Sequence, residues 1–343
     1  MDSGFIIEKS IFILVIFAFT MIMAMYSTWA ERKVAAYLQD RVGPNRAGWG
    51  GLLQPLADGM KLFAKEEFEP NTKNKFLFFM GPAIAMSTAL MTSAVIPWGD
   101  KLVIFGRTVT LQATDIDGSL LYIFAIVSIG VYGIMIGGWA SNNKFSLMGA
   151  VRAASQMVSY EVAMGLSIIA LLMMTGTLSL KEISVQQHGL HWNVFYQPLS
   201  FLIFLICAFA ETNRTPFDLA ECESELIGGY HTEYSSMKMG FYLFAEYANM
   251  FISSTIIAVL FFGGYNYPGM TWAVEHWGVN IANIIGIGAL FVKLCFFIFF
   301  FMWIRWTIPR FRYDQLMNLG WKILIPLSIV NIIITGICIL AFK

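Results

Sequence analysis

The chain has 343 residues, of which 57% are hydrophobic and only 13% are charged, and its mean hydropathy is +0.66. An ordinary soluble domain has about 25% charged residues, and a 38.5 kDa globule could not bury this much apolar surface, so the composition excludes a soluble enzyme and a disordered chain. Basic and acidic residues number 22 each, so the basic excess that a nucleic-acid-binding protein needs is absent.

The sequence predicts an all-α polytopic membrane protein with a single domain over residues 1–343. A helix that crosses the hydrocarbon needs about 20 mostly apolar residues, and eight stretches qualify. The fifth is the weakest, because it is short and runs into Glu211. The predicted spans cover residues 10–29, 76–96, 120–139, 157–174, 196–211, 241–262, 281–303 and 324–342.

The basic residues of the loops orient the predicted bundle. Sixteen of the 22 Lys and Arg residues fall in loops one, three, five and seven, whereas loops two, four and six together hold three. Cytoplasmic loops of membrane proteins are enriched in Lys and Arg. We therefore expect the odd loops to face the cytoplasm and both termini to face the opposite side, which is the periplasm in a bacterium.

Loop one, residues 31–70, contains a predicted amphipathic helix over about residues 52–66. Its charged face holds Asp58, Lys61 and Lys65. A helix of this kind lies in the membrane interface. Two interpretations stay open, a positive-inside anchor and a lip over a cavity that opens to the bilayer. The apolar face is formed by Leu53, Leu56, Ala57, Met60, Phe63 and Ala64.

Loop five, residues 211–234, carries an unusual excess of acid. Six carboxylates face a single base, Arg214, and apolar residues such as Phe217 and Leu226 are interleaved with them. This pattern favours partial burial over a solvated acidic face. Clustered, partly buried carboxylates have raised and mutually coupled pKa values, which suits proton exchange. The six are Glu211, Asp218, Glu221, Glu223, Glu225 and Glu233.

Three ionisable residues lie inside predicted spans: Glu161, Glu246 and Lys293. A charge at the bilayer centre costs at least ~2.5–3.5 kcal/mol on insertion scales, so each is a functional candidate. For Glu246 the alternative is snorkelling to the interface. For Lys293 a structural ion pair with a carboxylate competes with a role in a proton relay. Loop seven, residues 305–322, is either a positive-inside signal or a basic docking surface for an acidic partner.

No metal site is expected in this chain. The His188 and His191 pair is expected to be ordinary polar surface. The cysteines lie too far apart to form an iron–sulfur or zinc site within this chain alone. They are Cys207, Cys222, Cys295 and Cys338.

Long motifs in loops one, five and seven and in the sixth span resemble a known family. The chain is similar to a membrane component of respiratory complex I, called the H subunit in bacteria and NADH dehydrogenase subunit 1 in mitochondria. The similarity covers residues 31–327. It rests on the strings ERKVAAYLQDRVGPNR, LLQPLADGMKLFAKE, ETNRTPFDLAECESELIGGYHTEY, LFAEYANM and PRFRYDQLMNLGWK.

The resemblance implies a non-redox subunit of a proton-pumping NADH:quinone oxidoreductase in the bacterial inner membrane, where it forms the quinone entrance and part of the quinone chamber. Family residues near the chamber and its mouth match Glu31, Arg32, Arg41 and Asp58. An acidic funnel below the chamber matches Glu211, Asp218, Glu221, Glu223 and Glu225. The carboxylates that continue towards the small membrane subunits match Glu161 and Glu246, and Lys293 also has a family counterpart. One departure is Cys222, where many relatives have Gly or Ala.

The same resemblance implies the partners and cofactors. Quinone is the substrate, and FMN and iron–sulfur clusters are expected in partner subunits, with none in this chain. The expected partners are the iron–sulfur and quinone-site subunits of the hydrophilic arm, the small membrane subunits and membrane lipid. Two alternatives stay open: a stand-alone cation or proton transporter, which should work alone, and the membrane anchor of an energy-converting hydrogenase, whose relatives usually match loop one poorly.

Overall fold

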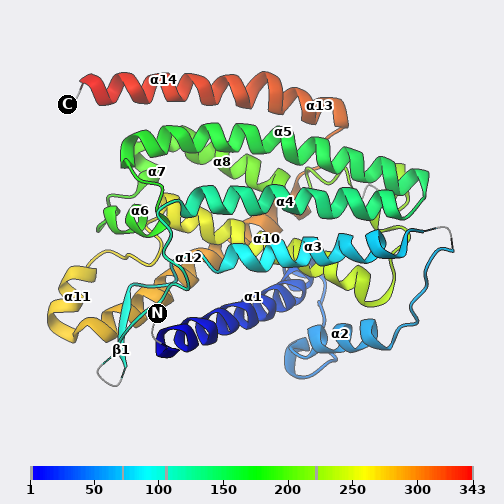
Figure 1. Cartoon of the computed structure of the whole chain (residues 1–343), viewed down its shortest axis with the longest axis horizontal. Coiled ribbons are helices and arrows are strands. Elements are labelled where there is room, and N and C mark those ends of the chain that lie inside the picture. The colour runs from blue at the N-terminus through cyan, green and yellow to red at the C-terminus, as the bar shows by residue number, and fades with distance from the viewer. Residues whose placement is uncertain (1–2, 72, 105–106, 221–222, 342–343) are drawn as a thin grey trace.

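The computed structural model describes residues 3–71, 73–104, 107–220 and 223–341, and these are mostly helical (Figure 1). Seven helical segments are long and apolar enough to cross a membrane by length and composition. They coincide with seven of the eight predicted spans. They are α1 (Ser3–Leu38), α3 (Lys75–Ser93), α4 (Ser119–Ala140), α5 (Lys144–Thr175), α10 (Ser236–Phe261), α12 (Val279–Thr307) and the run of α13 (Tyr313–Asn318), π-helical η3 (Leu319–Leu324) and α14 (Ile325–Ala341).

The fifth predicted span, residues 196–211, corresponds to a shorter helix. Helix α8 (Pro198–Glu211) has 14 residues and is therefore about 21 Å long, against roughly 30 Å of hydrocarbon. Pro198 starts it, and the chain turns at Thr212. The single turn α7 (Asn193–Tyr196) precedes it, so this segment enters the bundle as two short pieces.

Helix α5 begins 13 residues before the predicted span 157–174. The Asn143 side chain caps it by accepting a hydrogen bond from the Phe145 N–H at 2.9 Å. Polar residues of the first turns, Arg152 and Gln156 among them, lower the hydropathy there without breaking the helix. Hydropathy therefore located the apolar part of α5 and missed its polar extension.

The second loop contains a hairpin that the all-α prediction lacked. Strands β1 (Lys101–Ile104) and β2 (Arg107–Thr110) pair antiparallel. Asn280 of α12 fixes this hairpin, because its side chain accepts from the Val103 N–H at 2.8 Å and donates to the Val103 carbonyl at 2.9 Å. Strands this short, rich in β-branched residues, leave no signal at the scale of a membrane span.

The loops sort to the two ends of the bundle (Figure 1). The even-loop end comprises residues 94–104, 107–118, 176–197 and 262–278, together with the start of α1 and the end of α14. The odd-loop end comprises residues 39–71, 73–74, 141–143, 212–220, 223–235 and 308–312. The remaining short elements are η1 (Trp49–Gly51), α2 (Gln54–Ala64), α6 (Leu180–Gln186), α9 (Glu223–Leu226), η2 (Gly229–His231) and α11 (Met270–Trp277).

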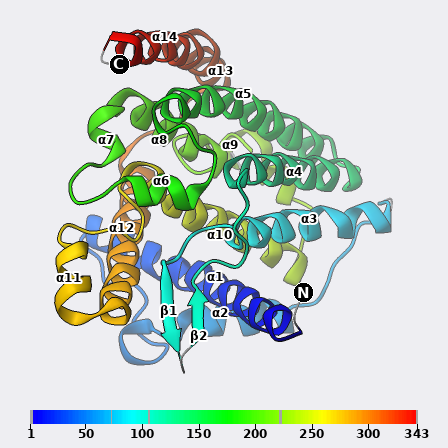
Figure 2. The same ribbon diagram turned by 60° about the vertical axis from the view of Figure 1, so that its left-hand side comes forward.

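Helix α10 lies in the centre of the bundle. In its most apolar 18-residue window 72% of the residues are buried, against 22% for α1. Figure 2 shows α13 and α14 along one flank beside α5, with α1 and α2 on the opposite flank. A charged residue on α10 is therefore surrounded by protein, where its partners are fixed by packing.

Candidate functional site

An open cleft lies between α1, α2 and α10; we call it the outer cleft. It contains an ion pair, because Arg32 Nη1 lies 2.7 Å from Asp58 Oδ2. The structure thus brings together two of the four residues that the resemblance assigns to the quinone. The side chains that define its chemistry are Met25, Thr28, Arg32, Asp58, Phe244 and Tyr247.

Helix α2 covers most of the predicted interfacial helix, and its orientation favours the interpretation as a lip. Met60 and Phe63 are 68% and 74% exposed and point away from the bundle, whereas Asp58 lines the outer cleft. The C-terminal end of α2 is tied to α10, since Ser236 Oγ donates to the Leu62 carbonyl at 3.0 Å. The helix therefore presents its apolar face outward and its charged face to the cleft.

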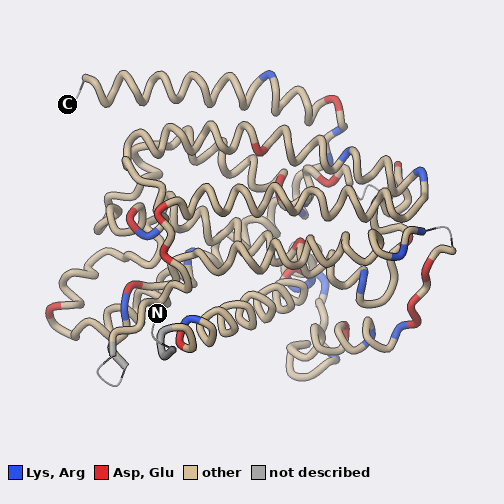
Figure 3. Tube along the Cα trace, viewed as in Figure 1, with Lys and Arg blue, Asp and Glu red and all other residues tan. Residues whose placement is uncertain are grey.

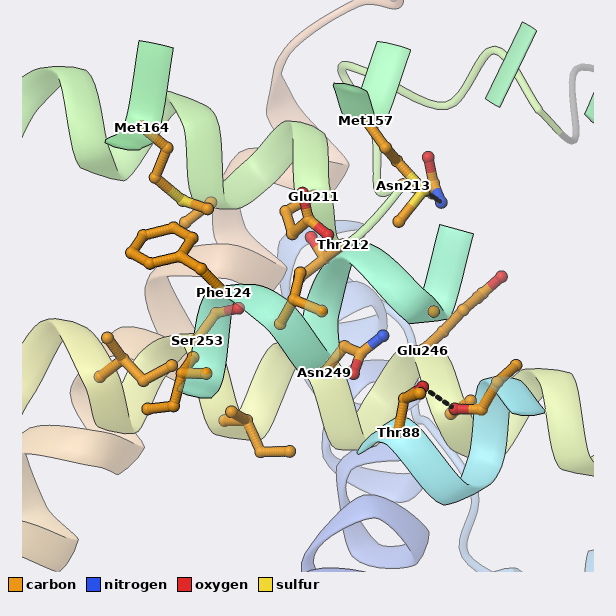
Figure 4. A pocket seen from close by; sticks show the side chains of 18 of the residues that line it. Thr88, Phe124, Met157, Met164, Glu211, Thr212, Asn213, Glu246, Asn249 and Ser253 are labelled. Carbon is orange, nitrogen blue, oxygen red and sulfur yellow. Dashed lines mark hydrogen bonds between the residues drawn. The ribbon is translucent and has the colours of Figure 1, made fainter. Parts of the chain in front are cut away.

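A second cavity lies inside the bundle among α3, α4, α5, α8 and α10; we call it the inner cavity (Figure 4). Most of its lining is apolar, including Phe124 and Met164. Glu211 enters it from the end of α8 and Glu246 from α10. Its other polar lining residues include Thr88, Asn213, Asn249 and Ser253.

Between the two cavities lies a group of buried charges, the buried ion network, formed by Glu31, Arg214, Glu246 and Arg305. Arg214 Nη1 lies 3.6 Å from Glu31 Oε2, and Arg214 Nη2 lies 3.5 Å from Glu246 Oε2. Arg305 makes a close ion pair with Glu31. Figure 3 shows acidic and basic segments close together near the C-terminal end of α1.

Glu246 does not snorkel to the interface. It is only 8% exposed, and its Oε1 accepts a hydrogen bond from the Tyr230 hydroxyl at 2.9 Å while Oε2 faces Arg214. Because Tyr230 belongs to η2 and Arg214 to the segment after α8, two parts of loop five hold this one carboxylate. Loop five is thereby attached to the centre of α10.

The backbone of loop five is fixed where Arg214 leaves it. Asn213 has a φ of +49°, a left-handed conformation that Asn adopts more readily than most residues and that reverses the chain after α8. The buried Gln156 side chain donates to the carbonyls of Ala210 at 2.9 Å and Phe217 at 2.8 Å. The turn is therefore held from both sides, and the Arg214 side chain is directed into the bundle.

Tyr247 separates the two cavities. Its ring lines the outer cleft, and the Arg214 guanidinium carbon lies 4.1 Å from the ring centroid. The next residue along α10 towards its N-terminus, Glu246, lines the inner cavity. The buried ion network is thus part of the wall between the outer cleft and the inner cavity.

The remaining candidate carboxylates lie in different surroundings. Glu161 accepts a hydrogen bond from Ser128 and is close enough to Glu211 for the two carboxylates to repel each other. Asp218 is buried and lies 3.1 Å from Arg310 of loop seven. The structure therefore gathers Glu161 with Glu211 and attaches Asp218 to a neighbouring loop.

Other predicted site residues lie farther out. Glu225 is half-exposed at the surface, 2.6 Å from Arg152, and Arg41 is exposed and bonded to its neighbour Gln39. Glu221 and Cys222 lie outside the described residues, and of Glu223 only the backbone at the start of α9 is described. The expectation of a partly buried loop five is confirmed from Asn213 to Ala220, where all residues but Thr215 are buried.

Lys293 has partners that neither expectation named. Among the described residues no ion pair joins it to a carboxylate; its ammonium donates to the carbonyls of Phe262 at 2.7 Å, Gly264 at 2.8 Å and Asn266 at 2.6 Å. The first of these carbonyls belongs to the C-cap residue of α10, and the other two belong to the turn that follows the helix. Lys293 therefore caps α10 at the even-loop end, with Trp192 stacked beside it at 5.4 Å.

Tyr234 closes loop five against α3 and α4. Its hydroxyl contacts the carbonyls of Phe78 at 3.1 Å and Gly137 at 3.3 Å. Burial raises the pKa of Tyr234 to about 12. The hydroxyl keeps its proton at physiological pH and holds the loop as a hydrogen-bond donor.

Two basic residues of loop seven form ion pairs with acidic residues elsewhere in this chain. Arg305 pairs with Glu31 and Arg310 with Asp218, and the Phe311 N–H donates to the Pro216 carbonyl at 3.1 Å. The docking interpretation is correspondingly weaker for these two bases. Sequence reasoning did not place Arg214 or Arg305 in the site, although a lone base among six acids is a signal for the first.

Comparison with known proteins agrees with the resemblance. The sequence pattern of a family described as NADH dehydrogenase matches residues 11–336. The chain is 84% identical over 343 residues to the H subunit of NADH-quinone oxidoreductase from Flavobacterium psychrophilum, covering all of both chains. It is 47% identical over 338 residues to an H subunit of the same enzyme from Geobacter sulfurreducens, covering 95% of this chain and 93% of the relative. The chain therefore belongs to the family of the NADH-quinone oxidoreductase H subunits, which are components of complex I.

Proposed function

We propose that the outer cleft is the entrance through which a quinone passes from the bilayer to its chamber, and that the buried ion network and the inner cavity couple quinone reduction to proton translocation. The observation that carries the proposal is the position of the network, between a cleft that opens beside α2 and an inner cavity that contains Glu211 and Glu246.

The outer cleft suits a quinone chemically. A quinone has a long apolar tail and a head with two carbonyl oxygens, which accept hydrogen bonds. Met25 and Phe244 supply apolar walls, and Arg32 beside Asp58 supplies a charged donor. The outward apolar face of α2 fits contact with lipid, so the tail could enter along this helix. Arg41, exposed beside the cleft-forming loop, would act together with a partner subunit.

The buried ion network suits a coupling role because the energies of its ion pairs are comparable to the cost of moving a charge across the membrane. Moving one charge against 100 mV costs about 2.3 kcal/mol. Removing one partner from a buried ion pair costs about 3–5 kcal/mol. Exchanging the partners of Glu31 and Glu246 therefore involves energies comparable to the cost of moving one charge across the membrane. Glu211 and the neighbouring Glu161 would continue the pathway towards the small membrane subunits.

Quinone reduction also requires electrons from outside this chain. We assign the electron carriers, FMN and iron–sulfur clusters, to partner subunits of the hydrophilic arm, which would dock at the odd-loop end. That end would face the cytoplasm, with the chain in the bacterial inner membrane. Its Lys and Arg excess supports this orientation.

The two alternative functions have less support. A stand-alone transporter and a hydrogenase anchor could both use buried carboxylates. The relatives that match over nearly the whole length, loop one included, carry the name of the quinone oxidoreductase component. Copurification with iron–sulfur subunits separates the transporter, which would be purified alone.

The proposal is tested with Asp58→Asn in the intact complex. Without the carboxylate, Arg32 loses its partner in the cleft, and we expect the KM for a short-chain quinone to rise about fivefold, as for the loss of about 1 kcal/mol of binding. Electron transfer from NADH to ferricyanide should stay unchanged. The matched control is Asp115→Asn, which breaks an exposed pair with Lys181 at the even-loop end. An unchanged KM for quinones of two tail lengths would contradict the proposal.

A further inference from the structure

We propose that Arg214 is a positioning residue that transmits a change of charge from the outer cleft to the inner cavity, by shifting between Glu31 and Glu246. The inference rests on the proposed function, since it assigns the step that connects the two cavities. It adds a single moving side chain to a pathway otherwise described only by its carboxylates.

The first observation is that Arg214 lies midway between two carboxylates. Its Nη1 is 3.6 Å from Glu31 Oε2 and its Nη2 is 3.5 Å from Glu246 Oε2. A close charge-assisted hydrogen bond is about 2.7–2.9 Å long. Both contacts are longer than that by similar amounts, so a displacement of about 1 Å would make one pair close and separate the other.

The second observation is that each carboxylate keeps a partner when Arg214 moves away. Glu31 is paired with Arg305, and Glu246 accepts from the Tyr230 hydroxyl at 2.9 Å. A buried charge left without any partner would make the shift too costly. With these second partners, the two positions of Arg214 differ by less than the loss of a whole ion pair.

The third observation is the surface along which the guanidinium would move. Its carbon lies over the Tyr247 ring, 4.1 Å from the ring centroid, a cation–π contact that a planar cation can keep while it slides across the ring. The backbone at Arg214 is held by Gln156 through the carbonyls of Ala210 and Phe217. The motion is therefore confined to the side chain.

Burial makes the shift effective. Glu31 and Arg214 are each 5% exposed and Glu246 is 8% exposed, so their interactions are screened far less than those of surface charges. A change of charge in the outer cleft that favours the pair with Glu31 draws Arg214 away from Glu246. The inner cavity then loses a nearby positive charge, and the reverse shift restores it.

The first test is Arg214→Lys in the intact complex. Lysine keeps the charge but lacks the planar fork that reaches both carboxylates. We expect kcat for NADH oxidation by a short-chain quinone to fall about tenfold, equivalent to about 1.4 kcal/mol, with KM changed by less than about twofold. The matched control, Lys181→Arg, alters an exposed pair with Asp115 at the even-loop end and should leave both constants unchanged. A normal kcat with normal proton pumping in Arg214→Lys would overturn the inference.

A second test keeps Arg214 and remains informative where the lysine variant fails to assemble. Glu31→Gln, Glu246→Gln and the double variant form a cycle measured by kcat. If both carboxylates act through Arg214, the second substitution should add less than about a twofold loss to the first. Losses that multiply would show independent action and overturn the inference.

The same cycle separates this inference from the proposed function. If neither single variant changes quinone turnover or proton pumping, the proposed coupling role of the network is wrong. If each lowers turnover and the losses multiply, the coupling role stands and only the shift of Arg214 is refuted.

Discussion

Two groups of buried charge lie towards opposite ends of α10 and are stabilised in different ways. In the buried ion network, Arg214 is shared by two carboxylates beside two cavities. After the last turn of α10, the Lys293 ammonium is held by three backbone carbonyls. A charge inside a membrane helix thus does not identify a functional group by itself. Alternative partners and an adjacent cavity distinguish a group that can change state from one that holds the structure.

The cap around Lys293 involves more than this one residue. Gln187 donates to the carbonyls of Val259 at 3.0 Å and Leu260 at 3.2 Å, and Asn193 donates to that of Leu260 at 2.8 Å. The carbonyls at the C-terminus of α10 therefore have donors from the C-cap residue of α6, from α7 and from α12. Such a set of bonds fixes one arrangement, whereas for the ion network we propose two.

The largest effect is expected from Lys293→Met, which tests whether Lys293 differs from the buried ion network in holding the structure. Three buried carbonyls lose a charged donor, and we expect the free energy of unfolding to fall by roughly 3 kcal/mol or more. The measurement is the yield of intact complex and the midpoint of its thermal inactivation. Lys181→Met, at an exposed ion pair, is the control and should shift the midpoint little. Unchanged stability with lost pumping would place Lys293 with the ion network instead.

A kinetic effect without a large stability effect is expected from Glu211→Gln. Glu211 is buried, and no ion pair to it is found among the described residues, so an amide of the same size should cost less than about 1 kcal/mol of stability. Because the amide cannot change its charge, we expect the rate of proton pumping to fall about tenfold. Pumping into proteoliposomes and thermal inactivation are measured together. Glu182→Gln at the even-loop end is the control, and equal pumping in both variants would remove Glu211 from the pathway.

The smallest effect concerns a partly exposed ion cluster at the odd-loop end. Hydrogen bonds from Lys238 and Lys73 lower the pKa of Glu69 to about 2. Ionised Glu69 therefore stabilises the attachment of residues 66–71 to α10 above its ordinary pKa near 4.5, and this contribution is lost as the pH falls towards 2.

Hydrogen exchange of residues 66–71 checks this expectation. Protection should be equal at pH 7 and pH 5 and lower at pH 3.5. Glu69→Gln should weaken protection at pH 7 by no more than about 1 kcal/mol, because the pair is partly exposed. The control is Glu66→Gln. Protection that already falls between pH 7 and pH 5 would show that other groups hold this segment.

Local patterns were enough to predict much of the candidate site. The spacing of Leu56, Met60 and Phe63 predicted α2, and the apolar residues among the loop-five acids predicted the partial burial that is seen from Asn213 to Ala220. The direction in which α2 faces was open, because periodicity defines two faces of a helix and not what each one contacts. Only packing against α1 and α10 placed Asp58 in the outer cleft.

The sequence by itself determined that much of the chain is apolar enough for a lipid environment, which family the chain belongs to and where most helices lie. These properties follow from long apolar stretches and long motifs, which are made of contiguous residues. The tertiary structure alone decided which charges meet. Glu31 and Arg305 are 274 residues apart, and Arg214 and Glu246 come from separate segments. Such pairs depend on how distant helices pack, so no local pattern could show that Arg214 is shared or that Lys293 caps a helix.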